Sequence, residues 1–264
     1  MSRVALVILA LLLAGPAAAE EVVSKKTICA IARTVKHEGC AIDLAISFGL
    51  QPTGLVPTFP EGVTCRQIDE AWAINYSGKR SGEAYHGGID IPAPTGTPIL
   101  AAADGEVIAV FEGKNSYRGK EIVLRHSPAE TGLKVWTFTA YSHFSKLPKL
   151  KVGDRVHRGD VLGPTGNSGR GREPFQQSDH RRPAIHFAVF YGPSPDFVIR
   201  AETVVPAKAH WADPNAFLAG TVPLDSAKAA ALPDAKKHVA VAVMLKDGSI
   251  LPASAKRIWP YACH

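Results

Sequence analysis

The sequence lacks several features that define other classes of protein. It has only four cysteines in 264 residues, none spaced as a C-x-x-C pair, which argues against a cysteine-ligated metal. It has no dense basic array interleaved with aromatic residues, which argues against a nucleic-acid partner. Beyond residue 14 it has no apolar run long enough to cross a bilayer. These absences favour a globular protein with neither a nucleic-acid partner nor an internal membrane span.

The composition is that of a folded, turn-rich chain. Hydrophobic residues make up 46% and charged residues 20%, which suits a globular domain rather than a disordered one. The 23 glycines and 20 prolines lie in turns between short runs, which favours strands over a helical bundle. The formal net charge of +6 suits association with anionic polymers.

The first 19 residues have the pattern of a secretory signal peptide. Arg3 precedes an apolar run of eleven residues, Val4–Ala14, and Ala17-Ala18-Ala19 forms an A-x-A cleavage signal. The run is short for a membrane anchor, and no cysteine follows the small residues as a lipoprotein anchor would require. We therefore expect residues 1–19 to be removed on secretion across the inner membrane, with the mature protein in the periplasm.

The four cysteines all follow this leader, and an even count in an exported chain predicts disulfides. Three pairings are possible. We favour Cys29–Cys40, which are close in sequence, together with Cys65–Cys263, which would tie the start of the domain to its end.

The rest of the chain divides into three parts. Residues 20–71 form an N-terminal segment that is partly helical between Thr27 and Leu50. Residues 72–218 carry short β-rich runs separated by Gly/Asp turns, which is typical of an antiparallel sandwich or barrel. Residues 219–264 comprise a linker and a hairpin-like extension, with Val239–Leu245 and Ser249–Leu251 as its strands. The runs in the middle part are Pro98–Ala102, Glu106–Phe111, Glu121–Arg125, Val135–Tyr141, Val161–Leu162 and Ala184–Tyr191.

The motif His86-Gly87-Gly88-Ile89-Asp90 is the first candidate for metal binding. An imidazole and a carboxylate four residues apart can converge on one ion, and the two glycines allow a tight backbone path between them. On its own the pattern also fits a turn histidine followed by a strand-start aspartate.

A second histidine, His186, lies inside the apolar run Ala184–Tyr191. Alternation along a strand puts Ala184 and His186 on one face. A histidine in such a strand is usually a satisfied core or surface residue. Beside His86 and Asp90, however, it is a plausible third ligand, and two histidines, an aspartate and an open fourth position form a catalytic zinc arrangement.

Two further motifs complete the set. Tyr141-Ser142-His143 ends a strand, and a histidine that is not a ligand can orient a water or stabilise an oxyanion beside a metal. The turn cluster Gly163–Arg170 is a tight loop. It has neither the G-x-S-x-G frame of a nucleophile elbow nor the lysine of a P-loop.

Together, these motifs resemble the lysostaphin-type (LytM-type) zinc metalloendopeptidases of peptidoglycan over about residues 72–218. The resemblance rests on their order as well as their content. The matching segments are Tyr85–Ile99, Ala101–Val107, Tyr141–Phe144, Val152–Val156, Gly159–Gly163, Thr165–Gly169, His186–Val189 and Ala212–Pro214.

The resemblance implies a fold, a cofactor and a set of roles. The fold is a mainly β, antiparallel sandwich of the LytM or duplicated-hybrid-motif type. His86, Asp90 and His186 would bind one zinc ion per chain, and His143 would be catalytic. The implied activity is hydrolysis of peptide cross-links or stems of peptidoglycan, with the peptidoglycan peptide as partner.

One position departs from the family pattern. The family has a second catalytic histidine two residues before the last ligand, and this chain has Ala184 there. The segment between Gly169 and His186 is also long and basic. Our hypothesis is that His180, or an arginine of this segment, fills the space that Ala184 leaves; a solvated loop is the alternative.

Two other functions are consistent with parts of the sequence. Residues 151–160 resemble a hairpin of lipoyl-type carrier domains, but no lysine stands between Val156 and Gly159, so a carrier is disfavoured. The stronger alternative is a weakly active or non-catalytic family member that binds peptidoglycan or regulates a cell-wall amidase. The retained ligand positions favour an enzyme, whereas Ala184 favours the regulatory alternative.

Overall fold

The computed structural model describes residues 23–32, 44–68, 79–80, 84–114, 116–147, 149–169 and 182–264. The expected signal peptide, residues 1–19, and His180 lie outside these residues. Among the described residues, no helix is both long and apolar enough to cross a membrane.

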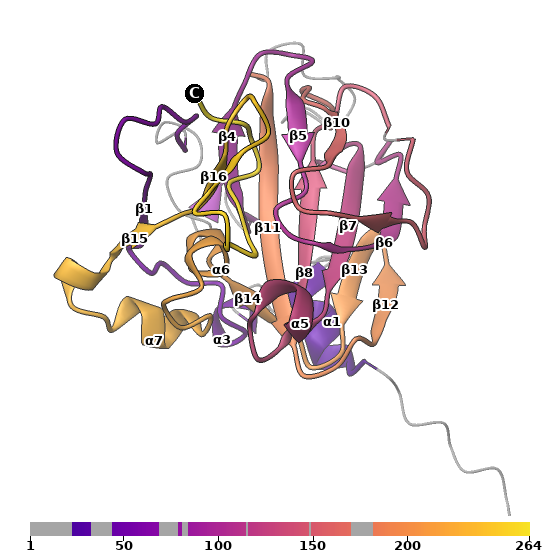
Figure 1. The fold of residues 1–264 in the computed structure, drawn as a ribbon. Helices are drawn as coiled ribbons and strands as arrows, with labels where there is room; N and C mark the ends of the chain where they lie inside the picture. Colours follow the sequence, from indigo (N-terminus) through magenta and orange to yellow (C-terminus); the bar gives the residue numbers. More distant parts are fainter. Residues whose placement is uncertain are drawn as a thin grey trace, which may run out of the picture.

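A seven-stranded antiparallel sheet forms the centre of the molecule (Figure 1). Its strand order is β14-β11-β8-β7-β6-β9, and β4 pairs with β11 beyond this path. The longest strand, β11, therefore has β8 on one side, and β4 and β14 at different heights on the other. The bounds are β4 Ile89–Pro92, β6 Gly105–Phe111, β7 Glu121–His126, β8 Trp136–Ser142, β9 Arg155–Val156, β11 Ala184–Gly192 and β14 His210–Ala212.

These strands form where β-branched and aromatic residues fill both faces of the chain. In β8 every residue after Trp136 is buried, and β11 is buried at all but one of its positions. Such strands must be covered on both faces. Phe187 of β11 packs against Phe217 of helix α6 (Pro214–Ala219) and against Tyr141 of β8. The central strands are therefore held rigidly, which fixes the side chains that they carry.

The remaining pairs are short two-stranded ribbons. The ribbons are antiparallel except β1 with β15, which run parallel. The pairs are β1 (Val56–Thr58) with β15 (His238–Ala240), β2 (Lys79–Arg80) with β3 (Ala84–Tyr85), β5 (Pro98–Leu100) with β10 (Val161–Pro164), β12 (Phe197–Arg200) with β13 (Thr203–Pro206), and β16 (Val243–Met244) with β17 (Ile250–Leu251).

In the part of the chain that the structure describes, helices are few and short. The N-terminal segment contributes α1 (Lys25–Ala32) and α3 (Leu44–Ser47), which confirms its partly helical character. The others are α5 (Pro128–Thr131), α6, α7 (Ser226–Ala230) and the 3₁₀ turn η1 (Asp234–Lys236). The predicted fold class, a mainly β antiparallel sandwich core with a partly helical N-terminal segment, is confirmed.

Strand β1 and the C-terminal extension, residues 219–264, lie together on one flank of the sheet (Figure 1). Cys65 and Cys263 form the predicted disulfide, and the backbones of Thr64 and His264 exchange two hydrogen bonds beside it. Cys29 is also disulfide-bonded, but its expected partner Cys40 lies outside the described residues.

The predicted C-terminal hairpin is correct only in part. Residues 243–244 and 250–251 pair as expected around the Asp247-Gly248 turn. Residues 239–240 were expected to begin the same strand, but they belong to β15 and pair with β1 instead. There Val239 is buried in a small cluster with Leu55, Ala216 and Ala229, so burial against the N-terminal segment outweighs a longer hairpin.

Candidate metal centre

The three predicted ligands converge because of the pairing between β4 and β11. Asp90 lies directly opposite His186 in that antiparallel pair, so their side chains share one face. His86 precedes β4 and returns to the same face through Gly87 and Gly88. A Cβ on Gly88 would lie 2.6 Å from Cε1 of His186, so only glycine allows the backbone to pass this close.

The ligand atoms form a compact triangle. His86 Nε2 lies 3.0 Å from Asp90 Oδ1, and His186 Nδ1 lies 2.9 Å from Asp90 Oδ1 and 3.0 Å from His86 Nε2. Ligands at about 2.0–2.1 Å around a tetrahedral zinc ion are about 3.3–3.4 Å apart, so the triangle needs only a slight expansion to hold one. All three residues are buried. This donor set fits zinc and leaves one coordination position open.

The electrostatics of the triangle suit cation binding. Burial raises the pKa of the Asp90 carboxyl, but the charge of His86 and hydrogen bonds with both imidazoles outweigh it and hold that pKa well below the usual range. The site therefore presents a carboxylate and two imidazoles.

The predicted catalytic residue His143 stands beside the triangle. Its ring centroid is 5.8 Å from that of His186, and the residue is buried. Its backbone has a φ of 71°, a left-handed conformation that is uncommon for a residue with a side chain. The imidazole Nδ1 lies 2.8 Å from the carbonyl oxygen of Ser168. Because a carbonyl only accepts, Nδ1 carries the proton, and Nε2 of the neutral ring is the acceptor nitrogen.

Comparison with known proteins places this site within a recognised family segment. Residues 84–195 match the family model described as Peptidase family M23. This segment, the M23 segment, is therefore similar to peptidases of family M23. The matched residues contain the metal triangle, His143 and Ala184, so the whole candidate site lies within the M23 segment.

Curated relatives carry the same segment within longer chains. The peptidoglycan DD-endopeptidase ShyA of Vibrio cholerae is 32% identical over 110 residues, which are 39% of this chain and 23% of ShyA. The DD-carboxypeptidase/endopeptidase Mpg of Neisseria meningitidis is 35% identical over 96 residues, 36% of this chain and 20% of Mpg. The chain thus spans about a fifth of the length of these relatives. Among solved structures, LytU matches at 24% identity with a TM-score of 0.40, covering 61% of this chain and 90% of LytU.

The structure describes Ala184 but not His180, the residue expected to fill the space beside it. Ala184 begins β11, two residues before His186, and lies opposite Pro92 of β4. It is buried and brings only a methyl group to the M23 site. The hypothesis that His180 replaces the missing histidine stays a prediction, because His180 lies outside the described residues.

Sequence reasoning missed two buried polar residues of the M23 segment. Glu121, at the start of β7, lies opposite Ser142 of β8, and the Ser142 hydroxyl donates a 2.6 Å hydrogen bond to Glu121 Oε2. Burial raises the pKa of the Glu121 carboxyl, and the charge of Arg118 and the hydrogen bond from Ser142 oppose this rise only in part. The only sequence signal for this buried pair was the position of an acidic residue, Glu121, at the start of an apolar run.

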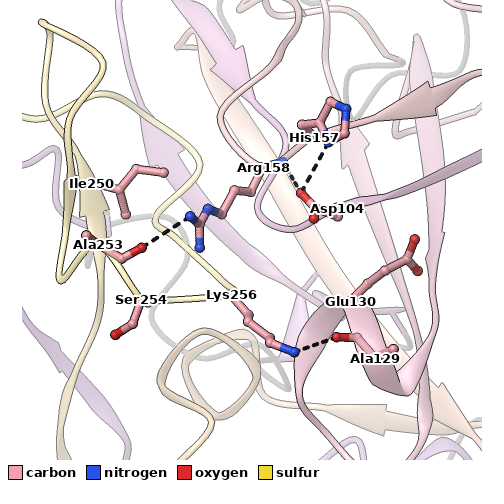
Figure 2. Close-up of a pocket in the computed structure, with 9 residues that line it drawn as sticks. All are labelled: Asp104, Ala129, Glu130, His157, Arg158, Ile250, Ala253, Ser254 and Lys256. Carbon is pink, nitrogen blue, oxygen red and sulfur yellow. Dashed lines mark hydrogen bonds and ion pairs between the residues drawn. The ribbon is translucent and has the colours of Figure 1, made fainter.

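A separate cavity of about 690 Å³ lies where the M23 segment meets the C-terminal extension (Figure 2). Arg158 donates to the carbonyl of Ala253, and Lys256 donates to the carbonyl of Ala129, so each side contributes one cation to the other. None of the cavity residues belongs to the metal triangle. This cavity therefore lies at the interface between the M23 segment and the C-terminal extension. Its lining residues are Asp104, Ala129, Glu130, His157, Arg158, Ile250, Ala253, Ser254 and Lys256.

Proposed function

We propose that this chain is a zinc-dependent endopeptidase that hydrolyses peptide cross-links or stems of peptidoglycan in the periplasm. The observation that carries the proposal is the buried triangle of His86, Asp90 and His186, with His143 beside it. The match of residues 84–195 to the family M23 model and relatives named as peptidoglycan DD-endopeptidases support it. The leader pattern of residues 1–19 supports export.

The side chains of His86, Asp90 and His186 would hold one Zn²⁺ ion per chain. When bound, zinc supplies Lewis-acid polarisation of a peptide carbonyl and lowers the pKa of a water molecule towards neutrality. The carboxylate of Asp90 offsets part of the cation's charge, and burial keeps bulk water away from the three ligands.

His143 is suited to move a proton at Nε2. Its Nδ1 proton is engaged by the Ser168 carbonyl, so the neutral ring accepts a proton at Nε2. As imidazolium the same atom donates, either to the oxyanion or to the leaving amine. The rigid β8 and β11 strands hold this ring and the ligands at a fixed separation, as proton transfer requires.

The relatives and the expected compartment support the proposed substrate class. A DD-endopeptidase activity is named for ShyA, and a periplasmic enzyme of this type would cut the cross-link between a diamino acid and D-alanine.

Metal content tests the proposal first. The mature protein, purified without chelator, should contain about one zinc per chain, whereas His86→Ala should contain almost none because the triangle loses one of its three donors. Elemental analysis of both proteins measures this. A folded wild-type protein that binds no zinc, even after dialysis against it, would contradict the proposal.

Activity then separates this proposal from its alternative. Purified peptidoglycan or cross-linked muropeptides should be cleaved by the zinc-loaded protein and left intact by His86→Ala, as followed by mass spectrometry. The alternative, a weakly active or non-catalytic protein that binds peptidoglycan or regulates a cell-wall amidase, is favoured by Ala184. Zinc binding and sacculus binding without cleavage would support that alternative.

A further inference from the structure

A row of buried polar side chains crosses the sheet at the level of the metal site. Glu121 of β7 is opposite Ser142 of β8, Ser142 is opposite His186 of β11, and His186 is opposite Asp90 of β4. Residues directly opposite one another in antiparallel strands share a face. The carboxyl groups of Glu121 and Asp90 are therefore at the two ends of one row, and the metal triangle accounts only for the Asp90 end.

The Glu121 carboxyl has little compensation for its burial. Its Oε2 accepts the Ser142 hydroxyl at 2.6 Å and lies 3.4 Å from Nε of Arg118, while its buried Oε1 accepts no hydrogen bond from any described residue. The next three residues of β7 are apolar and fully buried. A buried carboxyl with so few partners is a poor means of stabilising a fold, so its presence calls for a role in the site.

The contacts of Glu121 lead to His143 by a short route. Ser142 directly precedes His143, and the His143 amide donates to the carbonyl of Arg118 at 3.0 Å. The regular pairing of β7 and β8 ends at Glu121 and Ser142, and the chain turns there into the left-handed conformation of His143. The side-chain bond between Glu121 and Ser142 thus fastens the last pair before that turn.

The route closes into a ring through Ser168. The amide of Lys120 donates to the Ser168 hydroxyl at 3.0 Å, and the Ser168 carbonyl accepts Nδ1 of His143. Lys120 is bonded covalently to Glu121, which completes the ring. Gly119 makes the approach possible, because a Cβ there would lie 2.3 Å from the carbonyl carbon of Ser168. One ring of contacts therefore sets both the backbone and the tautomer of His143.

We propose that Glu121 is a positioning residue which, by holding the Ser142 hydroxyl, fixes the backbone turn and the Nδ1–H tautomer of His143. Its effect on catalysis rests on the proposed function, whereas its effect on His143 itself does not. Glu121 acts on the site through Ser142 and His143.

The first test observes the His143 ring directly. Long-range ¹⁵N–¹H correlation spectra of the zinc-loaded mature protein report the tautomer of each histidine ring, and a His143→Gln spectrum assigns the His143 signals. Wild type and Glu121→Gln should show the Nδ1–H form, since the glutamine carbonyl still accepts from Ser142. Glu121→Ala and Ser142→Ala should show a mixed tautomer, whereas His143 signals identical to wild type in both variants would overturn the proposal.

Two controls keep this test decisive. Glu106→Gln alters a glutamate–arginine pair elsewhere in the same sheet, in which Arg125 Nη2 lies 2.7 Å from Glu106 Oε2, and should leave the His143 signals unchanged. If thermal unfolding shows that Glu121→Ala does not fold, the test relies on Ser142→Ala alone. That variant removes the hydroxyl donor of Ser142 and keeps the Glu121 carboxylate. Zinc content should stay at the wild-type level in every variant.

The second test measures turnover of a cross-linked muropeptide. Glu121→Ala should lower kcat by about 10–100-fold with KM nearly unchanged, because substrate contacts are kept while His143 is misplaced. Glu121→Gln should stay within a few-fold of wild type, and the double variant with Ser142→Ala should be no slower than the slower single variant. Multiplied losses in the double variant would overturn the proposal. If the wild type cleaves nothing, the proposed function fails, and the ¹⁵N–¹H spectra of the His143 imidazole still decide the role of Glu121.

Discussion

At position 184 a single methyl group stands where family M23 is expected to place an imidazole. Ala184 is buried, and its strand position fixes its side chain on the same face as His186. The ligands, by contrast, are complete, and His143 keeps a defined tautomer. The chain thus retains the three metal ligands and one of the two catalytic histidines that the family pattern implies. We therefore predict that the protein binds the metal and turns over its substrate slowly.

The substitution Ala184→His tests this directly. An added imidazole beside the metal should raise kcat for muropeptide cleavage by about 10²–10³-fold, the typical worth of one oxyanion-stabilising group. Steady-state kinetics of the zinc-loaded variant and wild type measure the change, with Ala184→Gln as the control for side-chain bulk. An unchanged or lower rate in a variant with full zinc content would show that another group already does this work.

At the level of the element, helix α6 shows how a buried cap ties stability to pH. Asp213 caps α6, accepting the amide of Asn215 at 2.8 Å and the hydroxyl of Thr53. Burial raises the pKa of the Asp213 carboxyl to about 6, despite these hydrogen bonds. A raised carboxyl pKa means that the folded state binds the proton more tightly than the unfolded chain does. The contribution of Asp213 is therefore fully present below about pH 4 and is lost as the pH rises through 6.

Asp213→Asn should remove that dependence while keeping a good helix cap. Relative to wild type, the variant should gain about 2–3 kcal/mol of unfolding free energy between pH 4 and pH 7, because it has no proton to lose. Urea unfolding at several pH values measures both proteins. His126, a buried histidine whose pKa burial lowers to about 4, is common to both and cancels in the difference. Parallel curves would contradict the pKa assigned to Asp213.

The elements also show what the sequence can and cannot predict. The strands β6, β7, β8 and β11 were located within one or two residues, because a short β-rich run bounded by turn residues is a local signal. The metal triangle was also predicted, since His86 and Asp90 share one motif. The role of Glu121 was missed because it depends on its register opposite Ser142, and the pairing of β1 with β15 joins segments about 180 residues apart. Neither register nor long-range pairing leaves a local pattern.

At the scale of the whole molecule, residues 64–66 and the C-terminal residues 259–264 form a clasp on one flank of the sheet. The Cys65–Cys263 disulfide links residues 198 apart, and Trp259 donates from its indole to the Arg66 carbonyl nearby. Tyr261, two residues before Cys263, forms a 2.6 Å hydrogen bond with the hydroxyl of Thr165. Thr165 begins the loop that carries Ser168, the partner of His143. The hydrogen bond of Tyr261 therefore connects the clasp to the loop that contacts His143.

Replacing both Cys65 and Cys263 by serine should lower the unfolding free energy by about 5 kcal/mol, because closing so long a loop strongly restricts the unfolded chain. The loss should be smaller if the backbone pairing of Thr64 with His264 persists and residual structure in the unfolded chain already restricts it. Urea unfolding at neutral pH measures the unfolding free energy of both proteins. Lys256→Ala serves as the control: it removes one exposed hydrogen bond between the C-terminal extension and Ala129, and it should lower the unfolding free energy by under about 1 kcal/mol. Equal stability of the double variant and Lys256→Ala would mean that packing alone closes the clasp. A clasp that depends on the disulfide would instead make folding of the Ser168 loop dependent on an oxidising compartment, which is the environment that the leader pattern predicts.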